Sequence, residues 1–264
     1  MGSTENIEAR RVDIVWDLYS DMSLKKQVRD DRGQGIRRQV HDNYKLPSNW
    51  SNFLKNTYNK EELYKLLGCY ALQGNLGIHI VTNIGTTIKS SVPTNTLLTG
   101  LNVTCEEADS RIILHAKDTL MNGATNITHT VDSDVLIIDI SYYFSLKRLG
   151  LKELWLSFGT GNHHSYIAAH DLAHHLGEER VEDMRGYHAF TGSDTVSAFY
   201  SKGKTLTWKV WQQFIDATSA FKALTNPLNE LTDDILISLE NVIDREAHVE
   251  DDIELDSEVL EAEG

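Results

Sequence analysis

The sequence has few cysteines and no long apolar run, and each absence excludes a class of protein. Only Cys69 and Cys105 occur in 264 residues, which excludes a disulfide-dense secreted scaffold. No apolar stretch reaches the roughly 18 residues that a membrane span needs. The first residues, MGSTENIEARR, lack the apolar core of a secretory signal. We therefore expect an intracellular protein that does not enter membranes, with the nucleus as one candidate compartment.

Positive charge is also scarce, but it is concentrated in one part of the chain. Lys and Arg number 25 against 39 Asp and Glu, which gives a formal net charge of −14. Residues 240–264 hold eleven acids and a single base, a composition typical of a solvated, partly disordered end. Residues 10–60 instead carry eleven Lys and Arg against six Asp. The overall acidity therefore does not exclude a nucleic-acid partner.

Between these two ends, short apolar runs alternate with stretches of helical spacing. The runs typical of strands are residues 12–16, 78–81, 135–140 and 154–156. The helical patterns are residues 23–38, 59–72, 105–120, 164–176 and 205–224. This alternation predicts an α/β fold with a mostly parallel sheet and helices on both faces. We expect one domain over residues 12–224, followed by an acidic, partly disordered tail over residues 225–264.

Several acids stand at or beside the ends of these predicted elements, and the ends of parallel strands are where such sheets bind ligands. Asp17 directly follows the first apolar run, and Asp194 lies in a turn between two helical patterns. Taken singly, such acids are more often turn residues, N-caps or partners of the helix dipole. The full set, in order along the chain, is Asp17, Glu107, Asp109, Asp132, Asp134 and Asp194.

The order of these acids resembles that of the flap-endonuclease/PIN-like family of metal-dependent nucleases. VWDLY is similar to the VFDG strand end of the family, EADS to its EAEA helix start, DSDVL to its DxDxL and GSDT to its GSDY. The resemblance covers about residues 12–224 and places all six acids on metal-site positions. It implies a PIN-like sheet in which the six carboxylates converge in one cleft at the ends of the strands.

The cofactor implied by this resemblance is a pair of Mg²⁺ or Mn²⁺ ions. Two such ions about 3.5–4 Å apart can activate water and stabilise both the attacking and the leaving oxygen. Carboxylates suit these hard cations as ligands, and six of them gathered without metal would repel one another strongly.

The resemblance extends to basic residues that would bind phosphate. Lys25 and Arg32 stand where the family carries a Lys and, seven positions beyond it, an Arg, and this spacing puts both on one helix face. Lys202, Gly203 and Lys204 resemble the Gly-rich turn with which the family holds duplex phosphates. The alternatives are a solvated basic helix and a polar loop.

The family's first strand, which carries a further acid, has no counterpart before residue 12. We therefore expect a sheet without that strand, and metal binding and cleavage weaker than in an intact relative. The motif variants also resemble uncharacterised animal proteins of transposon-like distribution. The expected function is a divalent-metal-dependent phosphodiester hydrolase acting on DNA or RNA, or a degenerate copy of one. The alternative is a non-catalytic PIN-like module that binds nucleic acid or protein.

Other features of the sequence favour packing roles. His170 and His174 are spaced as zinc ligands can be, but HDLAH lacks the Glu of a zincin motif, so we expect surface or packing histidines. We expect Cys69 in the core, on an amphipathic helix. The tryptophans expected to pack rather than to stack on bases are Trp16, Trp155, Trp208 and Trp211. A Rossmann-like nucleotide binder is disfavoured, because no Gly-rich phosphate motif follows a strand.

Overall fold

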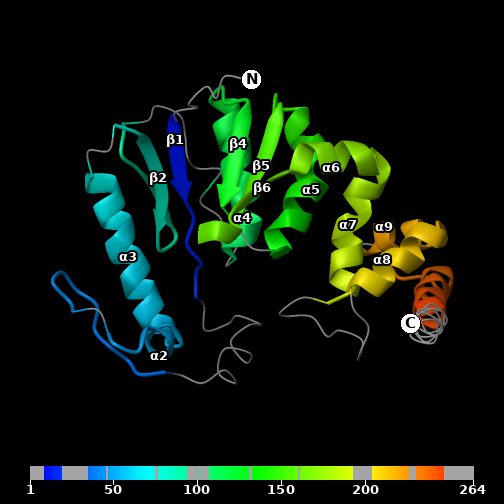
Figure 1. Cartoon of the computed structure of the whole chain (residues 1–264), viewed down its shortest axis with the longest axis horizontal. Coiled ribbons are helices and arrows are strands. Elements are labelled where there is room, and N and C mark those ends of the chain that lie inside the picture. The colour runs from blue at the N-terminus through cyan, green and yellow to red at the C-terminus, as the bar shows by residue number, and fades with distance from the viewer. Residues whose placement is uncertain are drawn as a thin grey trace, which may run out of the picture. The chain divides into compact units, whose positions relative to one another are not determined.

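The computed structural model divides the chain into two compact units, Met1–Ala124 and Thr125–Gly264 (Figure 1). Each unit is built on a three-stranded sheet accompanied by helices, which confirms the α/β class expected from the sequence. The residues that the structure describes are 9–19, 35–45, 47–74, 77–93, 101, 107–130, 133–159, 161–192, 204–225 and 230–246.

The sheet of the first unit consists of β1 (Arg11–Ile14), β2 (His79–Ile84) and β3 (Thr87–Ser90). β1 and β2 are parallel, and β2 and β3 form an antiparallel hairpin. Gly85 lies in the hairpin turn with a φ of +59°, a conformation that glycine adopts without strain. Because β1 and β2 are parallel, their carboxyl ends meet at one edge of this sheet.

The described helices of the first unit are α2 (Trp50–Leu54), α3 (Thr57–Gln73) and α4 (Ala108–Met121). The asparagines before α2 and α3 each accept a hydrogen bond from the backbone N–H three residues further on, as N-caps do. α3 lies along β2 (Figure 1), where Gly68 leaves room for the side chains of Thr82 and Ile84. α4 buries Ile113 and Leu120 on its inner face.

The sheet of the second unit repeats this arrangement with β4 (Asn126–Thr130), β5 (Glu153–Phe158) and β6 (Ser165–Ala168). β4 and β5 are parallel and joined through α5 (Ser133–Lys147), whereas β5 and β6 are antiparallel. A 3-10 turn, η2 (Gly161–His163), precedes β6.

The remaining helices of the second unit pack around aromatic side chains. They are α6 (Ala169–Leu176), α7 (Glu178–Phe190), α8 (Lys204–Gln213), α9 (Ala217–Leu224) and a helix over residues 233–246. Trp211 is 1% exposed, with its ring centroid 5.3 Å from that of Tyr187 and 4.9 Å from that of Phe221. The expected packing role of Trp211 is therefore confirmed.

Several elements match the sequence-based predictions. The strands at residues 12–16, 78–81 and 154–156 correspond to β1, β2 and β5. The helix predicted at residues 59–72 is α3, and that at residues 105–120 is α4, which begins a few residues later at Ala108.

Other predictions were wrong. The run at residues 135–140 is not a strand but part of α5, because a short continuous apolar run fits a buried helix as well as a strand. Residues 165–168 form β6 instead of helix, with Ile167 opposite Leu156 of β5. The single helix predicted at residues 205–224 is two helices, α8 and α9. Residues 214–216 between them are not helical, and α9 packs against α7.

The predicted helix over residues 23–38 is also incorrect where it can be checked. Residues 35–38 are not helical, and residues 23–34 lie outside the described part of the chain. The sheets are mixed rather than mostly parallel, because β3 and β6 each add an antiparallel partner. Within the segment expected as an acidic tail, residues 233–246 are helical and bury Leu239 and Val242.

Candidate functional site

Asp17 is the first acid of the predicted site, and the structure gives it a defined partner. It follows β1 at the carboxyl end of the parallel pair, and its Oδ1 accepts a hydrogen bond of 3.0 Å from the backbone N–H of Ala108. Ala108 is the first residue of α4, and Glu107 at the N-cap position makes no side-chain capping bond of its own. Asp17 therefore caps α4 from a distant part of the chain, satisfying one of the unpaired N–H groups of the helix start.

This contact places three of the six predicted acids at the start of one helix. Ala108 lies between Glu107 and Asp109 in the chain, so the bond from Ala108 to Asp17 places all three acids at the start of α4. The positive end of the helix dipole stabilises negative charge there. The sequence-based placement of these acids at a strand end and a helix start is thus consistent with the structure of the first unit.

Buried polar side chains hold the backbone just before Asp17. Arg111 of α4 is 1% exposed and donates a hydrogen bond of 3.0 Å from Nη1 to the carbonyl of Trp16. Asn83 of β2 accepts from the backbone N–H of Trp16 at 2.8 Å and donates back to the carbonyl of Trp16 at 3.2 Å. Sequence reasoning missed both residues, although a buried Asn within the apolar strand HIVTNI is a signal of a specific polar role.

Asp17 also lines a small cleft at this edge of the sheet. The cleft has a volume of about 10 Å³, enough for about one water molecule, and its other lining residues are Trp16, Leu18, Glu61, Tyr64, Lys65, Asn83 and Gly85. Tyr64 stacks on Trp16 with ring centroids 4.7 Å apart. Burial raises the pKa of Tyr64, and the charge of Asp17 adds to this effect.

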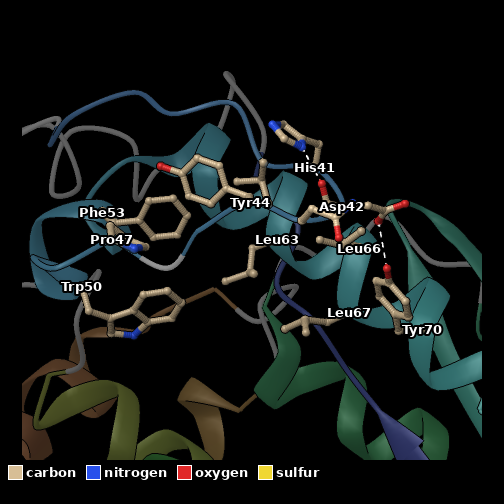
Figure 2. Close-up of a pocket in the computed structure, with 12 residues that line it drawn as sticks. His41, Asp42, Tyr44, Pro47, Trp50, Phe53, Leu63, Leu66, Leu67 and Tyr70 are labelled. Carbon is tan, nitrogen blue, oxygen red and sulfur yellow. Dashed lines mark hydrogen bonds between the residues drawn. The ribbon is translucent and has the colours of Figure 1, made fainter.

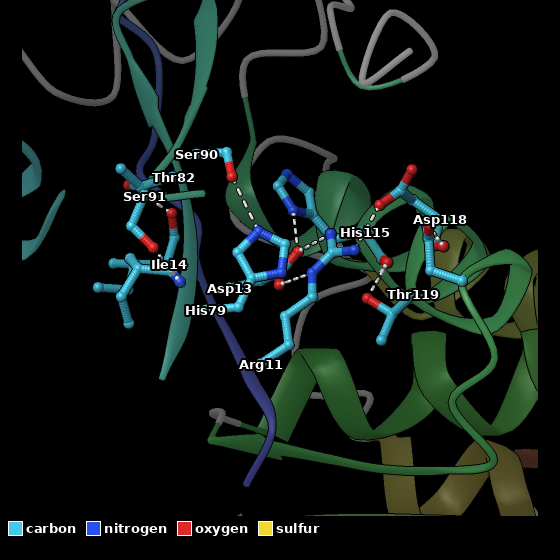
Figure 3. Close-up of polar contacts among 12 residues, drawn as sticks. Arg11, Asp13, Ile14, His79, Thr82, Ser90, Ser91, His115, Asp118 and Thr119 are labelled. Atoms are coloured by element: carbon cyan, nitrogen blue, oxygen red, sulfur yellow. Dashed lines mark hydrogen bonds and ion pairs between the residues drawn. The ribbon is translucent and has the colours of Figure 1, made fainter. Parts of the chain in front are cut away.

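A second buried polar cluster ties β1 to α4. Asp13 accepts hydrogen bonds from Arg11 at 2.6 Å and from Nδ1 of His115 at 2.7 Å, and Arg11 also pairs with Asp118 at 2.7 Å (Figure 3). Burial alone would raise the pKa of Asp13, but the hydrogen bonds from His115 and Arg11 outweigh it and lower that pKa. This cluster fixes the two elements that carry Asp17, Glu107 and Asp109.

The second unit carries the next pair of predicted acids at a strand end. Asp134 lies in the first turn of α5, directly after β4, whereas Asp132 lies outside the described residues. The strand predicted at residues 135–140 would place this pair before a strand, which is wrong, because these residues belong to α5 and the strand β4 precedes both acids in the chain. β4 and β5 are parallel, so Asp134 at the start of α5 follows the carboxyl end of a parallel pair.

A buried contact links β4 to α5 near this motif. His129 at the end of β4 hydrogen-bonds through Nδ1 to Asp139 of α5 at 2.7 Å, and Asp139 is fully buried. The contact holds the middle of α5, the helix that carries Asp134, against the strand before it.

The remaining predicted residues are placed only in part. Those outside the described part of the chain are Lys25, Arg32, Asp132, Asp194, Lys202 and Gly203. Lys204 is the first residue of α8, and its carbonyl accepts a hydrogen bond from the hydroxyl of Tyr187. The convergence of all six acids in one cleft stays a prediction.

The described residues do not form a ready metal centre. No group of three or more His, Cys, Asp or Glu among them is arranged to hold a metal ion. His170 hydrogen-bonds to the backbone of Leu154 and His174 to the hydroxyl of Tyr143, so both make packing contacts as expected. Cys69 is exposed rather than in the core, because the neighbouring Gly68 faces β2.

Comparison of the chain with known protein families, with curated proteins and with solved structures finds no match. Among the described helices, none combines the length and apolar character required to cross a membrane.

Proposed function

We propose that this chain is a divalent-metal-dependent phosphodiester hydrolase of PIN-like fold, or a degenerate copy of one, that acts on DNA or RNA. The observation that carries the proposal is the hydrogen bond from Ala108 to Asp17. It brings the acid after β1 next to the acid pair that opens α4, although about ninety residues separate them in the chain. Such a grouping is what the resemblance to flap endonucleases requires of Asp17, Glu107 and Asp109.

The order of strands and acids in the second unit supports the same proposal. The DSD motif follows β4, a strand with a parallel neighbour, as Asp17 follows β1. Ligand sites of parallel sheets lie at such strand ends. The resemblance assigns Asp132, Asp134 and Asp194 to metal as well.

The donor set suits Mg²⁺ or Mn²⁺, because it consists of carboxylates, the hard oxygen ligands that these ions prefer. Glu107 and Asp109 are the residues of the first unit that would hold the metal, together with Oδ2 of Asp17. Bound metal would supply an activated water and stabilise charge on the phosphate. Asp17 also has a structural role, because its Oδ1 accepts the hydrogen bond from Ala108 and holds the start of α4 in place.

The second candidate is a non-catalytic module that binds nucleic acid or protein. It is favoured by one observation, that the described acids are not gathered into a metal-holding group of three. In this case Asp17, Glu107 and Asp109 stabilise the start of α4 and have no metal to bind.

The substitution Asp17→Asn separates these two functions. Asparagine caps helices about as well as aspartate, so the variant keeps the fold but loses a charged metal ligand. We expect Mn²⁺ binding by calorimetry to weaken by at least about tenfold, and any Mn²⁺-dependent cleavage of flap, nicked or single-stranded substrates to be lost. Asp216→Asn, at an exposed acid that makes no capping bond, is the matched control.

Cleavage by the unaltered chain decides between hydrolase and binding module. Cleavage that disappears in Asp17→Asn and in an Asp132→Asn, Asp134→Asn double variant, but persists in the control, supports the hydrolase. A folded chain that binds no Mn²⁺ and cuts none of the three substrates would exclude it in favour of the module.

A further inference from the structure

The first unit contains an apolar pocket that shares no lining residue with the cleft beside Asp17. It has a volume of about 210 Å³ and lies between the segment before α2 and one side of α3. Figure 2 shows the rings of Tyr44, Phe53 and Trp50 on one side, facing leucines of α3. The lining residues are Val40, His41, Asp42, Asn43, Tyr44, Pro47, Trp50, Phe53, Leu63, Leu66, Leu67 and Tyr70.

The aromatic side of the pocket is a column of nearly parallel rings. Phe53 is the buried centre of the column, with Trp50 at 5.2 Å and 20° and Tyr44 at 6.3 Å and 25° between ring planes. Trp50 is 42% exposed and Tyr70 is 53% exposed, so large rings remain open to solvent beside the pocket. Exposed flat rings next to an apolar hollow favour a flat ligand.

The size of the pocket limits this ligand to one ring system. A cavity of about 150 Å³ takes a benzene molecule, and pockets for drug-sized ligands measure about 300–1,000 Å³. A volume of about 210 Å³ therefore matches one ring or one fused pair. A helical partner needs a long groove with several anchor positions, which this pocket does not provide.

Charge around the pocket favours a ligand that carries phosphate. Residues 35–62 hold five Lys and Arg against three acids, Asp42, Glu61 and Glu62, and Arg37 forms an ion pair with Glu62. Arg38, Lys45 and Lys55 are all exposed. This segment has a net charge of +2 within a chain whose net charge is −14. A ring to fill the hollow and a phosphate for the basic rim are the two parts of a nucleotide.

We propose that this pocket binds one unpaired base of a single-stranded nucleic acid, with the adjoining phosphates held by the basic residues around it. The base stacks on Trp50 and is covered from the other side by leucines of α3. Stacking on aromatic rings is tolerant of sequence, because every base has a flat π face. The pocket thereby selects an unpaired nucleotide without reading which base it is.

The test measures binding of a short oligothymidylate to the full chain in EDTA, beside an abasic strand of equal length. We expect the abasic strand to bind more weakly, and Trp50→Ala to reduce affinity for oligothymidylate by roughly 5- to 150-fold, the usual effect of losing one stacking ring. Leu67→Asp, which adds a negative charge at a 42% exposed pocket residue, should weaken binding as well. Tyr58→Ala, at a 58% exposed ring outside the pocket, should not.

Equal affinity for oligothymidylate and the abasic strand would overturn the proposal. It would also be overturned if Trp50→Ala and Leu67→Asp both fold and both bind oligothymidylate as the unaltered chain does. If Trp50→Ala weakens binding of a tryptophan-containing peptide but not of oligothymidylate, the pocket belongs to a protein partner instead. The proposal rests on the nucleic-acid function proposed above, but EDTA makes its test independent of metal. Base binding without Mn²⁺-dependent cleavage would refute an active hydrolase alone, and cleavage without base binding would refute the pocket alone.

Discussion

Asp13 of β1 links this strand to α4 through its hydrogen bond with His115, and the direction of the pKa shift of Asp13 determines how it contributes to stability. Its ionised form is favoured in the folded chain, since the hydrogen bonds from His115 and Arg11 outweigh the effect of burial. Its contribution is therefore complete above the unfolded pKa of about 3.9 and is lost as the pH falls through the lower folded value.

Asp13→Asn should lower the free energy of unfolding at neutral pH by about 1.5–3 kcal/mol, the range for hydrogen bonds to charged groups. The loss should narrow as the pH falls below about 4, because the unaltered Asp13 then becomes protonated too. Urea unfolding at a series of pH values measures both effects, with the exposed Asp216→Asn as the control. A deficit that stays constant into strong acid would show that the charge of Asp13 is not what stabilises the fold.

Asp183 of α7 has its pKa shifted in the opposite direction to that of Asp13. It is 2% exposed, and its Oδ2 has no hydrogen-bond partner within the described segments. Burial raises the pKa of Asp183 to about 6, although the charge of Lys222 partly opposes this. The folded chain holds this proton at a pH where the unfolded chain releases it, so stability falls as the pH rises from about 4 to about 6.

Asp183→Asn should therefore stabilise the protein at pH 7. The gain is up to about 3 kcal/mol, from about 1.4 kcal/mol for each unit between the folded and unfolded pKa. It should vanish near pH 4, where both variants are uncharged at this position. Thermal or urea unfolding at the two pH values checks it, and a loss of stability at pH 7 would mean that the buried carboxylate is compensated within the fold.

At the scale of elements, the sequence predicts most reliably those segments whose pattern has one interpretation. The amphipathic spacing of α3 fits no strand, and the residues of β1 are too few and too β-branched for a helix. α5 was mistaken for a strand because VLIIDI is apolar except for the buried Asp139, and only packing against neighbouring elements distinguishes a buried helix from a buried strand. β3 and β6 were missed because short hairpin strands depend on their partners for pairing.

The candidate site, too, could be predicted from the sequence only in part. The acids could be found from the sequence, since their spacing follows the ends of elements. Their supports could not, because Arg111 and Asn83 reach Trp16 only through long-range folding. The pocket beside α3 was equally hidden, since its walls come from several elements that meet only in the folded unit.

The contact between α7 and α9 depends on a glycine. A Cβ on Gly186 would lie 1.9 Å from the carbonyl oxygen of Phe221, in the backbone of α9, so no side-chain movement can relieve it. Gly186→Ala should destabilise the second unit by about 3 kcal/mol, at the upper end for overpacked cores. Ser219→Ala, an exposed position on α9, is the control. An unfolding midpoint equal to that of the unaltered chain would show that α7 and α9 do not pack this closely.

At the scale of the whole molecule, the uneven charge determines how the chain meets a polyanion. A net charge of −14 opposes binding, so any affinity for nucleic acid must come from local excess of positive charge, such as that of residues 35–60. Each phosphate neutralised on a single strand contributes about 0.7 to the slope of log K against log salt concentration. The slope therefore counts the contacts, whereas stacking leaves it unchanged.

The double substitution Lys45→Gln, Lys55→Gln should reduce the magnitude of this slope by about 1.4, because it removes two phosphate contacts at about 0.7 each. Trp50→Ala should lower the affinity at every salt concentration and leave the slope as it was, since a stacked base releases no counterion. Lys152→Gln, Lys209→Gln removes the same charge from exposed positions elsewhere and is the matched control. Titrations of oligothymidylate at several salt concentrations measure all four proteins. If the control changes the slope as much as the Lys45 and Lys55 variant does, the net charge of the chain, and not a basic rim around the pocket, governs binding.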